Sequence, residues 1–456
     1  MDAFDDYSRE QLVALILALS DQVRSQAVEI ASLKEQSGGG PGSPSTPSRA
    51  LPDWVKPNKP SRPKTERKKR NCAFVRARGE ATSEVEHAAD CCPDCGRKLE
   101  GGTLHHTREV IDLPDVKVET VEHKFYTRYC GVCQKRVAVG CKDALQNEVV
   151  GKRRIGVGVM SFIAYLRTMC NMTVEAICQL LDAQFGLEIS AGAVIDLLRG
   201  VADAGAPVVD TFLSDIRASP MVHADETSWR EDGKGGFVWS FSTPDTRFYQ
   251  REPSRGSDVV KQVLGEEFKG VLVTDFYAAY SFYPGEHQRC WVHYLRDLHY
   301  LKEKHPDDQS VQKFVADIRD VFDRAREYDR QEHPPSQRRA QRFLYQEELT
   351  RIARPFLKQE VPQRVLAERI EKFASELFVF VEYEHTPPDN NPAERAIRPL
   401  VTARKISGGT RSKTGSDTMA ILHTLFATWQ LRGHDVLKNF RLLLTGGLDL
   451  HGNPAS

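Results

Sequence analysis

The first part of the chain carries an apolar repeat of the coiled-coil type. Between residues 8 and 36, apolar side chains recur every seven positions in two rows. These rows are Ile16, Val23 and Ile30 on one side, and Leu12, Leu19, Gln26 and Leu33 on the other. β-branched residues in one row with Leu in the other favour a parallel two-stranded coiled coil. We therefore predict that residues 1–36 pair with a second copy, the alternative being an amphipathic helix packed on its own chain.

Residues 156–201 show apolar positions at helical spacing in three segments. The segments are 157–169, a second that Thr173 caps and that continues to 184, and 191–201, which Ser190 caps. Gly186 supplies the turn between the last two. This order predicts a helix-turn-helix unit whose third helix reads the major groove, with Arg199 as its basic residue. The alternative is an ordinary three-helix packing unit.

From residue 221 the pattern changes to short apolar runs typical of strands. We predict strands at 221–227, 237–242, 246–251, 271–276 and 288–292, with a helix at 257–265. Strand, strand, strand, helix, strand is the order of a ribonuclease H-like sheet. Residues 294–384 are then almost wholly helical, with runs at 309–328, 336–357 and 361–373, and two closing helices follow at 415–431 and 435–444.

Together these patterns predict a multidomain α/β protein, and 456 residues leave room for about three domains. The N-terminal part divides into a coiled-coil helix (1–36), a basic linker (37–80), a zinc ribbon (81–150) and a helix-turn-helix-like unit (151–205). The remainder is a ribonuclease H-like core (206–293), a helical insertion (294–385), a Glu-bearing helix with a basic loop (386–415) and C-terminal helices (416–456).

Composition changes this picture only locally. The formal net charge is zero, so the overall balance points to no partner. Residues 49–78, however, hold eleven Lys and Arg against two acids, next to a stretch rich in Gly, Ser and Pro. Lys68, Lys69 and Arg70 end this linker and are candidate phosphate contacts, because clustered cations release counterions from nucleic acid. The alternative is a solvated, merely charged linker.

The start of the chain and its cysteines indicate the compartment. The N-terminus lacks the basic region of a signal peptide, and the apolar run at 12–19 is too short to span a bilayer. Most of the ten cysteines lie in Cys-x-x-Cys pairs or in apolar or helical surroundings, which favours thiols and metal over disulfides. We expect a cytoplasmic, nucleoid-associated protein with no membrane partner.

Two cysteine pairs have the spacing of zinc knuckles. Cys92 and Cys95 form the first pair, and Cys130 and Cys133 the second. Two such pairs complete a tetrahedral Zn²⁺ site. Residues 108–128 between them alternate like two strands, so we predict a zinc ribbon that holds one structural Zn²⁺. Cys91 is an alternative ligand, but the two-residue gap before Cys95 favours Cys92, and the remaining alternative is incidental thiols.

Three carboxylates follow one another at the edges of the predicted elements. Asp225 and Asp275 end strand-like runs, and Glu394 begins a helix just after Pro392. Carboxylates from three elements can hold two Mg²⁺ ions about 3.5–4 Å apart, an arrangement that serves phosphoryl transfer. Glu226 follows Asp225 directly, but strand alternation sends it to the opposite face. A solvated strand end or a helix cap is the alternative for each acid taken alone.

Basic residues surround the predicted position of the acids. His293 and Arg296 follow a strand-to-helix junction and are candidate phosphate contacts, although a packed junction explains them slightly better. The stretch 394–413 holds a single acid, Glu394, and six basic residues: Arg395, Arg398, Arg404, Lys405, Arg411 and Lys413. Beside a phosphodiester site, such residues favour contacts to the DNA backbone over a solvated face.

Four motifs resemble those of DDE transposases of bacterial insertion sequences, and most closely those of the insertion-sequence-sixty-six family. They are His223-Ala-Asp-Glu-Thr, Thr274-Asp-Phe-Tyr-Ala-Ala-Tyr, Cys290-Trp-Val-His and Asn390-Asn-Pro-Ala-Glu-Arg. The resemblance covers nearly the whole chain and assigns catalysis to Asp225, Asp275 and Glu394. Only the loop at 406–415 departs from the family pattern.

The resemblance implies a transposase that binds terminal inverted repeats, cleaves strands with Mg²⁺ or Mn²⁺, and joins a 3′-hydroxyl to target DNA. Its expected partners are double-stranded DNA, at least one further copy of the chain, and companion proteins encoded by the same element. A structure-selective nuclease of the same fold and a non-catalytic DNA-binding regulator are the alternatives.

Overall fold

The computed structural model describes residues 80–114 and 116–455. Its contacts divide the chain into two units, Met1–Val110 and Ile111–Ser456, and each unit is described by itself. The predicted coiled coil at 1–36 and the linker that holds Lys68, Lys69 and Arg70 lie outside the described residues. Among the described helices, none combines the length and the apolar character needed to cross a membrane.

Both cysteine pairs lie in tight turns. In the first unit, the Gly96 N–H donates to the Cys92 carbonyl, and the Cys92 N–H donates to the Arg97 carbonyl, each at 2.9 Å. In the second unit, strands β1 (Thr127–Cys130) and β2 (Lys135–Ala138) form an antiparallel hairpin around Cys133.

The prediction of two strands within 108–128 is wrong for most of that range. Among residues 108–114 and 116–126 there is no strand, and only β1 reaches into the end of the range. A strand needs a hydrogen-bonded neighbour, and here the neighbour follows Cys133 rather than preceding Cys130. A four-residue helix, α2 (Cys141–Ala144), follows the hairpin.

The helices that follow are α3 (Val157–Thr168), α4 (Val174–Phe185) and α5 (Ala191–Ala218). Thr173 and Ser190 cap α4 and α5 by accepting backbone N–H groups, and Gly186 ends α4 in the left-handed conformation. The prediction that the third helix ends at 201 is wrong, because α5 runs for 28 residues. Its second half buries Val208, Phe212 and Ile216 against the sheet. This packing stabilises the helix beyond residue 201, where the apolar spacing in the sequence becomes less regular.

The sheet has five strands in the order β5-β4-β3-β6-β7. They are β3 (Met221–Glu231), β4 (Lys234–Ser242), β5 (Arg247–Glu252), β6 (Val271–Thr274) and β7 (His287–Arg289), and α6 (Ser257–Leu264) precedes β6. The first three strands are antiparallel neighbours, whereas β6 runs parallel to β3, and β7 parallel to β6. A mixed α/β fold is therefore observed, with the order of strands and helix that the apolar runs predict.

Strand alternation gives the sheet two different faces. Val222 and Ala224 of β3 face the core that contains α5 and α6. Trp229 faces the opposite side, where Ala396 and Leu400 of α12 (Asn391–Ser407) pack on it. Helices α13 (Lys413–Leu431) and α14 (Val436–Thr445) complete this part of the chain. Odd-numbered residues of β3 consequently point toward α12, and even-numbered residues point toward α6.

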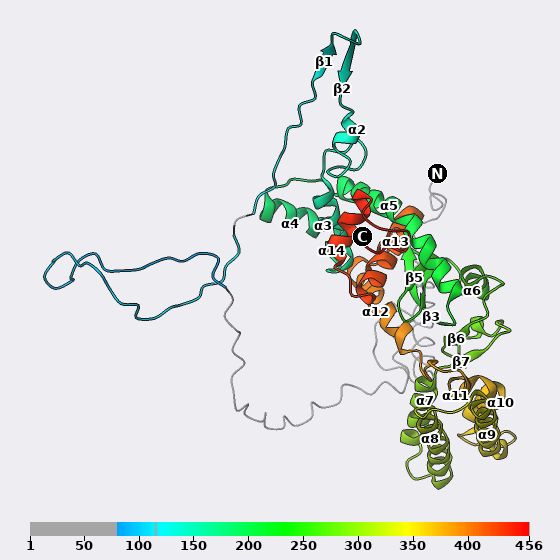
Figure 1. The fold of residues 1–456 in the computed structure, drawn as a ribbon. Coiled ribbons are helices and arrows are strands. Elements are labelled where there is room, and N and C mark those ends of the chain that lie inside the picture. Colours follow the sequence, from blue (N-terminus) through cyan, green and yellow to red (C-terminus); the bar gives the residue numbers. More distant parts are fainter. Residues whose placement is uncertain (1–79, 115, 456) are drawn as a thin grey trace, which may run out of the picture. The chain divides into compact units, whose positions relative to one another are not determined.

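The helical insertion has its own core. Its helices are α7 (Trp291–Lys304), α8 (Gln309–Asp329), α9 (Pro335–Ala353), α10 (Arg364–Leu377) and α11 (Val379–Glu382), with the 3-10 turn Arg354–Phe356 between α9 and α10 (Figure 1). Trp291, Phe322, Phe378 and Phe380 are buried in this core. The predicted strand at 288–292 is shorter than expected, because β7 ends at Arg289 and Trp291 already opens α7.

Candidate active site

Asp225 lies in the middle of β3, not at its end as the sequence suggests. The strand continues to Glu231 because β4 returns along it, and Asp225 pairs with Ser240 across that hairpin. Its odd position turns the carboxylate toward α12. The carboxylate Oδ1 accepts the Glu226 N–H at 2.9 Å, whereas Oδ2 has no hydrogen-bond partner among residues 80–114 and 116–455.

Asp275 follows the last residue of β6. The parallel register aligns Met221 with Val271, and His223 with Val273. Two residues beyond His223 and Val273, the same alignment brings Asp275 beside Asp225, because neighbouring strands run about 4.8 Å apart. Asp275 Oδ1 accepts the Tyr277 N–H at 2.8 Å, a local turn that fixes the carboxylate at the end of the strand.

Glu394 lies in the first turn of α12, where Pro392 suits the open N–H positions of a helix start. The residue before the helix, Asn390, is almost fully buried. Its Nδ2 donates to the Ala224 carbonyl at 2.9 Å, which leaves Oδ1 to accept Nδ1–H of His223 at 3.0 Å. Asn390 therefore connects the strand that holds Asp225 to the helix that holds Glu394.

Sequence analysis missed this connection. Burial lowers the pKa of His223 to about 4, so the ring is neutral and acts only as a hydrogen-bond partner at neutral pH. The Asn390 N–H also donates to the Sγ of Cys290 at 3.2 Å, which ties the helix start to the end of β7. The signal was present in the sequence as a histidine inside an apolar strand and a first asparagine in the motif at 390.

The three acids influence one another electrostatically. Burial, together with the like charges of Glu226, Asp275 and Glu394, raises the pKa of Asp225 to about 7, although one backbone N–H acts to lower it. Within residues 80–114 and 116–455, however, no three His, Cys, Asp or Glu side chains are near enough to bind one metal ion directly. The acids thus share a site without forming a closed ligand cage, which is the arrangement that repulsion between uncompensated carboxylates favours.

The donor set fits a divalent cation that prefers oxygen ligands. Glu394 Oε1 is buried and has no hydrogen-bond partner in the described part of the chain. Nε2 of His293 stands 3.7 Å from that oxygen, and its buried Nδ1 is also without a described partner. A carboxylate oxygen without a hydrogen-bond partner, beside two further acids, is suited to bind Mg²⁺ or Mn²⁺. The cation would reduce the repulsion between the carboxylates and accept this oxygen as a ligand.

Glu226 points to the other face of the sheet, as strand alternation requires. Its Oε1 accepts two bonds from Arg255, at 2.8 Å from Nε and 2.6 Å from Nη2, and its Oε2 accepts from the Tyr280 hydroxyl. All its oxygens are therefore engaged, which leaves none for a ligand. Its charge nevertheless raises the pKa of Asp225, so Glu226 is not an inert neighbour of the site.

The basic residues of α12 divide into two groups. Arg404 bonds Thr227 Oγ1 at 3.1 Å and the Ser228 carbonyl at 2.7 Å, so it fastens α12 to β3. Arg395, Arg398 and Lys405 are exposed, and their spacing puts them on one side of the helix that starts beside Glu394. We call these three residues the α12 stripe.

The other predicted DNA contacts belong to other elements. Arg296 is exposed one turn after His293 on α7. Arg199 is paired with Asp196 at 3.3 Å on α5, a helix whose second half belongs to the core beneath the sheet. Arg411 and Lys413 are exposed at the start of α13, where Lys413 is paired with Asp417.

The loop between α12 and α13 is bound to the end of β3. The Thr410 N–H donates to the Arg230 carbonyl, and the Asp232 N–H donates to the Thr410 carbonyl, each at 2.9 Å. Gly409 has a φ of 119°, and a Cβ there would meet the Arg230 carbonyl oxygen at 2.2 Å. The loop thus adds a strand-like contact to the end of β3, and this contact needs glycine at 409.

The cysteine pairs have thiols prepared for metal. Backbone N–H groups of Cys95 and Asp94 lower the pKa of the Cys92 thiol, and those of Cys133 and Val132 do the same for Cys130. Stabilised thiolates in tight turns are the form in which cysteine binds Zn²⁺. The two pairs belong to different units, so each is described alone.

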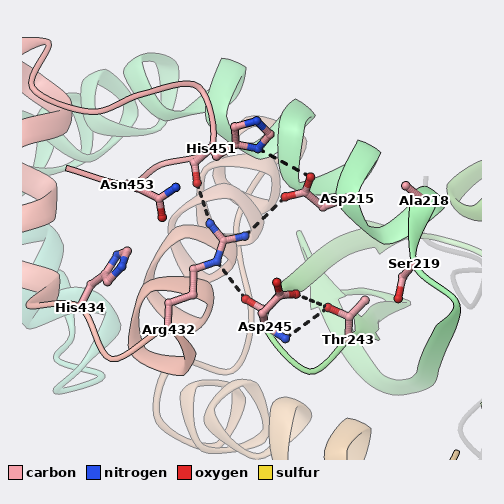
Figure 2. A pocket seen from close by; sticks show the side chains of 9 residues that line it. All are labelled: Asp215, Ala218, Ser219, Thr243, Asp245, Arg432, His434, His451 and Asn453. Atoms are coloured by element: carbon pink, nitrogen blue, oxygen red, sulfur yellow. Dashed lines mark hydrogen bonds and ion pairs between the residues drawn. The ribbon is translucent and has the colours of Figure 1, made fainter. Parts of the chain in front are cut away.

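A polar pocket of about 580 Å³ lies elsewhere in the second unit and contains none of the three acids. Figure 2 shows Arg432 at its centre, donating to the carbonyls of His451 at 2.6 Å and Asp245 at 3.0 Å. Its guanidinium also faces Asp215 at 3.4 Å. With its donors committed in this way, Arg432 fastens the C-terminal segment to α5 and to the turn between β4 and β5, which is a structural role.

Comparison with known proteins adds a family. A family model described as "Transposase IS66 family" matches residues 152–418, which is more than half of the chain and includes all three acids. The uncharacterized protein y4qI of Sinorhizobium fredii is 23% identical over 289 residues, 55% of this chain and 52% of that protein. The uncharacterized protein y4jO of the same organism is 32% identical over 152 residues, 33% of this chain and 45% of that protein. The chain thus spans about half the length of these curated relatives.

Proposed function

Because the chain belongs to the IS66 family of transposases, we propose that Asp225, Asp275 and Glu394 form its metal-dependent site for DNA cleavage and strand transfer. The observation that carries this proposal is the parallel register of β3 and β6, which aligns Asp225 with Asp275, together with the Asn390 bond that holds the helix of Glu394 against β3. The burial of Asp225 among like charges, which raises its pKa to about 7, supports the proposal. Such a group is expensive for a folded protein unless a cation compensates it. The strand order with β3 beside β6 supports assigning the core to the ribonuclease H-like fold.

The residues that would hold the cation are the three acids, through the free Oδ2 atoms of the aspartates and the orphaned Oε1 of Glu394. When bound, two Mg²⁺ or Mn²⁺ ions supply an activated water or hydroxyl and neutralise charge on the phosphate. Asn390 holds the helix of Glu394 against the strand of Asp225, and the turn at Tyr277 holds Asp275. His293 stands beside Glu394, where an imidazole can orient a phosphate oxygen or the carboxylate itself.

The DNA backbone would follow the α12 stripe. Its three cations lead away from Glu394 along one side of the helix, and Arg296 adds a fourth charge on α7. Arg404 belongs to the fold rather than to this path, because its guanidinium bonds β3. Phosphate contacts of this type fix the register of the duplex without reading its sequence, so recognition of the terminal repeats falls to other parts of the chain.

Those other parts are the N-terminal ones. The basic arm around Lys69, the zinc ribbon with Cys92, Cys95, Cys130 and Cys133, and the helices around Arg199 are the proposed contacts to the terminal repeats. The helix at 1–36 would pair two copies, so that two element ends are held together. Companion proteins of the same element and target DNA complete the proposed partners.

The test is cleavage of a DNA fragment that carries an element end and its flanking sequence. The full-length protein should release the end with Mg²⁺ or Mn²⁺ and not with EDTA. Asp275→Asn should reduce cleavage and joining together by several orders of magnitude, because metal charge stabilisation is worth several kcal/mol. Asp258→Asn is the matched control, since this acid is exposed on α6 and is paired with Lys261 of the same helix.

The other outcomes separate the alternatives. Metal-dependent cutting of branched DNA without joining would favour a structure-selective nuclease of the same fold. Tight binding of element ends without any cutting, unchanged in Asp275→Asn, would favour a non-catalytic regulator and would overturn the proposal.

A further inference from the structure

The loop that bears Asp275 leaves the sheet toward the helical insertion. Residues 275–277 lie between the end of β6 and the short 3-10 turn Ala278–Tyr280, outside any regular element. Backbone of this kind is positioned by its side-chain contacts rather than by a helix or a ladder. Besides the local bonds from Thr274 and Tyr277, two residues connect this loop to the helical insertion, Arg289 and Phe276.

Arg289 is completely buried at the end of β7 and spans the loop. Its Nη1 donates to the Asp275 carbonyl at 2.8 Å and lies 3.3 Å from the Tyr277 carbonyl, and its Nη2 donates to Ser281 Oγ at 3.0 Å. Nε donates to Oε2 of Glu376, at 2.6 Å. One guanidinium therefore connects the backbone of the second acid to α10 of the insertion.

Phe276 makes a second connection to the same helix. Its ring packs edge-on against Phe373 with the ring centroids 5.6 Å apart, and the Arg369 guanidinium lies 5.0 Å above it. Arg369 is itself paired with Asp297 of α7 at 2.5 Å. The residue directly after Asp275 is thus seated between two helices of the insertion.

We propose that α10 of the helical insertion positions Asp275 for the reaction, acting through Arg289 and Phe276. This inference rests on the proposed function of Asp275, and it makes Glu376 and Arg289 positioning residues of that site. One contact reaches the Asp275 carbonyl through Arg289 and the other reaches the Phe276 ring, and Phe373 of α10 packs against both the Arg289 guanidinium and that ring. Neither contact touches the carboxylate oxygens of Asp275. The insertion therefore fixes the place of the carboxylate and leaves its ligand sites free.

Glu376 is the residue through which this role is best tested. If Glu376 loses its charge, the buried Arg289 guanidinium loses its described carboxylate partner. We expect Arg289 then to shift and to change its bonds to the loop carbonyls. Glu376 also lines an open pocket of about 650 Å³, so an amide introduced there remains hydrated and the chain still folds. Glu376→Gln keeps the shape and removes the charge.

A matched control exists within the insertion. Arg338 is also buried, donates to the Val381 carbonyl, and is paired with Asp329 at 3.1 Å. Asp329→Asn removes the nearer carboxylate from this buried arginine, which keeps Glu384 at 3.6 Å, and in the described part of the chain neither Asp329 nor Arg338 bonds the Asp275 loop. It reports what the loss of a buried ion pair does to the insertion alone.

The experiment measures amide hydrogen exchange and Mn²⁺ binding in the full chain. We expect Glu376→Gln to speed exchange of the Tyr277 N–H, which donates to Asp275, and to weaken Mn²⁺ binding by about 10-fold or more, the range for outer partners of metal ligands. Asp329→Asn should change neither, and both variants should keep their affinity for terminal DNA. Glu376→Asp should restore part of the Mn²⁺ affinity.

Each result decides between the two proposals. If the exchange at Tyr277 in Glu376→Gln equals that in Asp329→Asn, then α10 does not position the loop and the inference is wrong. A second outcome is that exchange rises in Glu376→Gln while Mn²⁺ binding by the unaltered chain is absent or is not lost in Asp275→Asn. In that case α10 positions the loop, but the proposed metal site is wrong.

Discussion

The buried side chains of His223 and Asn390, 167 residues apart in sequence, are hydrogen-bonded at 3.0 Å and join the strand of Asp225 to the helix of Glu394. The relative positions of Asp225 and Glu394 consequently depend on the side-chain amide of Asn390. The orientation of this amide is fixed at both ends, because its Nδ2 also donates to the Ala224 carbonyl.

Asn390→Ala should therefore affect the metal site more than its size suggests. We expect the free energy of unfolding to fall by about 1–3 kcal/mol for the unsatisfied partners, and Mn²⁺ affinity to fall about 10-fold. Calorimetric Mn²⁺ titration and thermal unfolding measure the two effects. Asn439→Ala is the control, since Asn439 is a buried asparagine that also bonds a histidine, His434, but lies on α14. Equal Mn²⁺ affinity in the two variants would contradict the role of Asn390.

The pKa of Asp225 predicts an unusual dependence of stability on pH. Without metal, the folded carboxyl has a pKa of about 7 against an ordinary value of 3.8, so the folded state binds the proton more tightly than the unfolded state. The contribution of this group to stability is then best below about pH 4, declines as the pH rises toward 7, and is lowest above it.

Asp225→Asn removes this penalty. At pH 8 the free energy of unfolding of the metal-free variant should exceed that of the unaltered chain by an amount on the order of a few kcal/mol, and its melting temperature should be higher, with little difference near pH 4. Mg²⁺ should stabilise the unaltered chain at pH 8 and have little effect on the variant. Thermal melts across pH 4–8 with EDTA or Mg²⁺ measure this, and a destabilised variant at pH 8 would refute the proposed electrostatics.

The α12 stripe makes a prediction about salt. Arg398→Ala or Lys405→Ala should weaken binding to DNA of any sequence and reduce the slope of log affinity against log salt by about 1 for each lost phosphate contact. Arg404→Ala should instead lower thermal stability, since its guanidinium bonds β3. Arg330→Ala is the control, because this exposed residue is paired with Glu327 at the end of α8. A slope unchanged by both stripe variants would place the DNA elsewhere.

The cysteine pairs predict one Zn²⁺ per chain. Cys130→Ser should abolish zinc binding and unfold the hairpin β1–β2, because metal binding supplies much of the folding energy of such small units. Cys170→Ser is the control, an exposed cysteine outside both pairs. Elemental analysis of the purified chain measures the zinc content. A chain free of zinc, or a Cys130→Ser variant that retains it, would refute the ribbon.

The sequence predicts the order of elements well because that order is written in local apolar runs. It predicts their lengths less well, because lengths depend on distant partners. β3 continues to Glu231 since β4 returns along it, and α5 continues past 201 since the sheet covers its second half. The same limit applies to the site: strand alternation separates Asp225 from Glu226, whereas the bond from Arg289 to Glu376 spans 87 residues that no local pattern connects.

The chain enters and leaves the helical insertion at one point. The Trp291 N–H, at the start of α7, donates to the Pro388 carbonyl at 2.9 Å, so the two ends of a segment of about a hundred residues meet at one neck. Contacts such as Arg289–Glu376 hold the segment against the sheet as well. Evolution or a protein engineer can change the length of such a module at little entropic cost to the sheet. The sequence of the module is constrained more than its length, because any replacement must supply a carboxylate that pairs with Arg289 and an aromatic ring that packs against Phe276. Grafts that merely close the neck should give a folded chain in which Asp275 is displaced from its place beside Asp225.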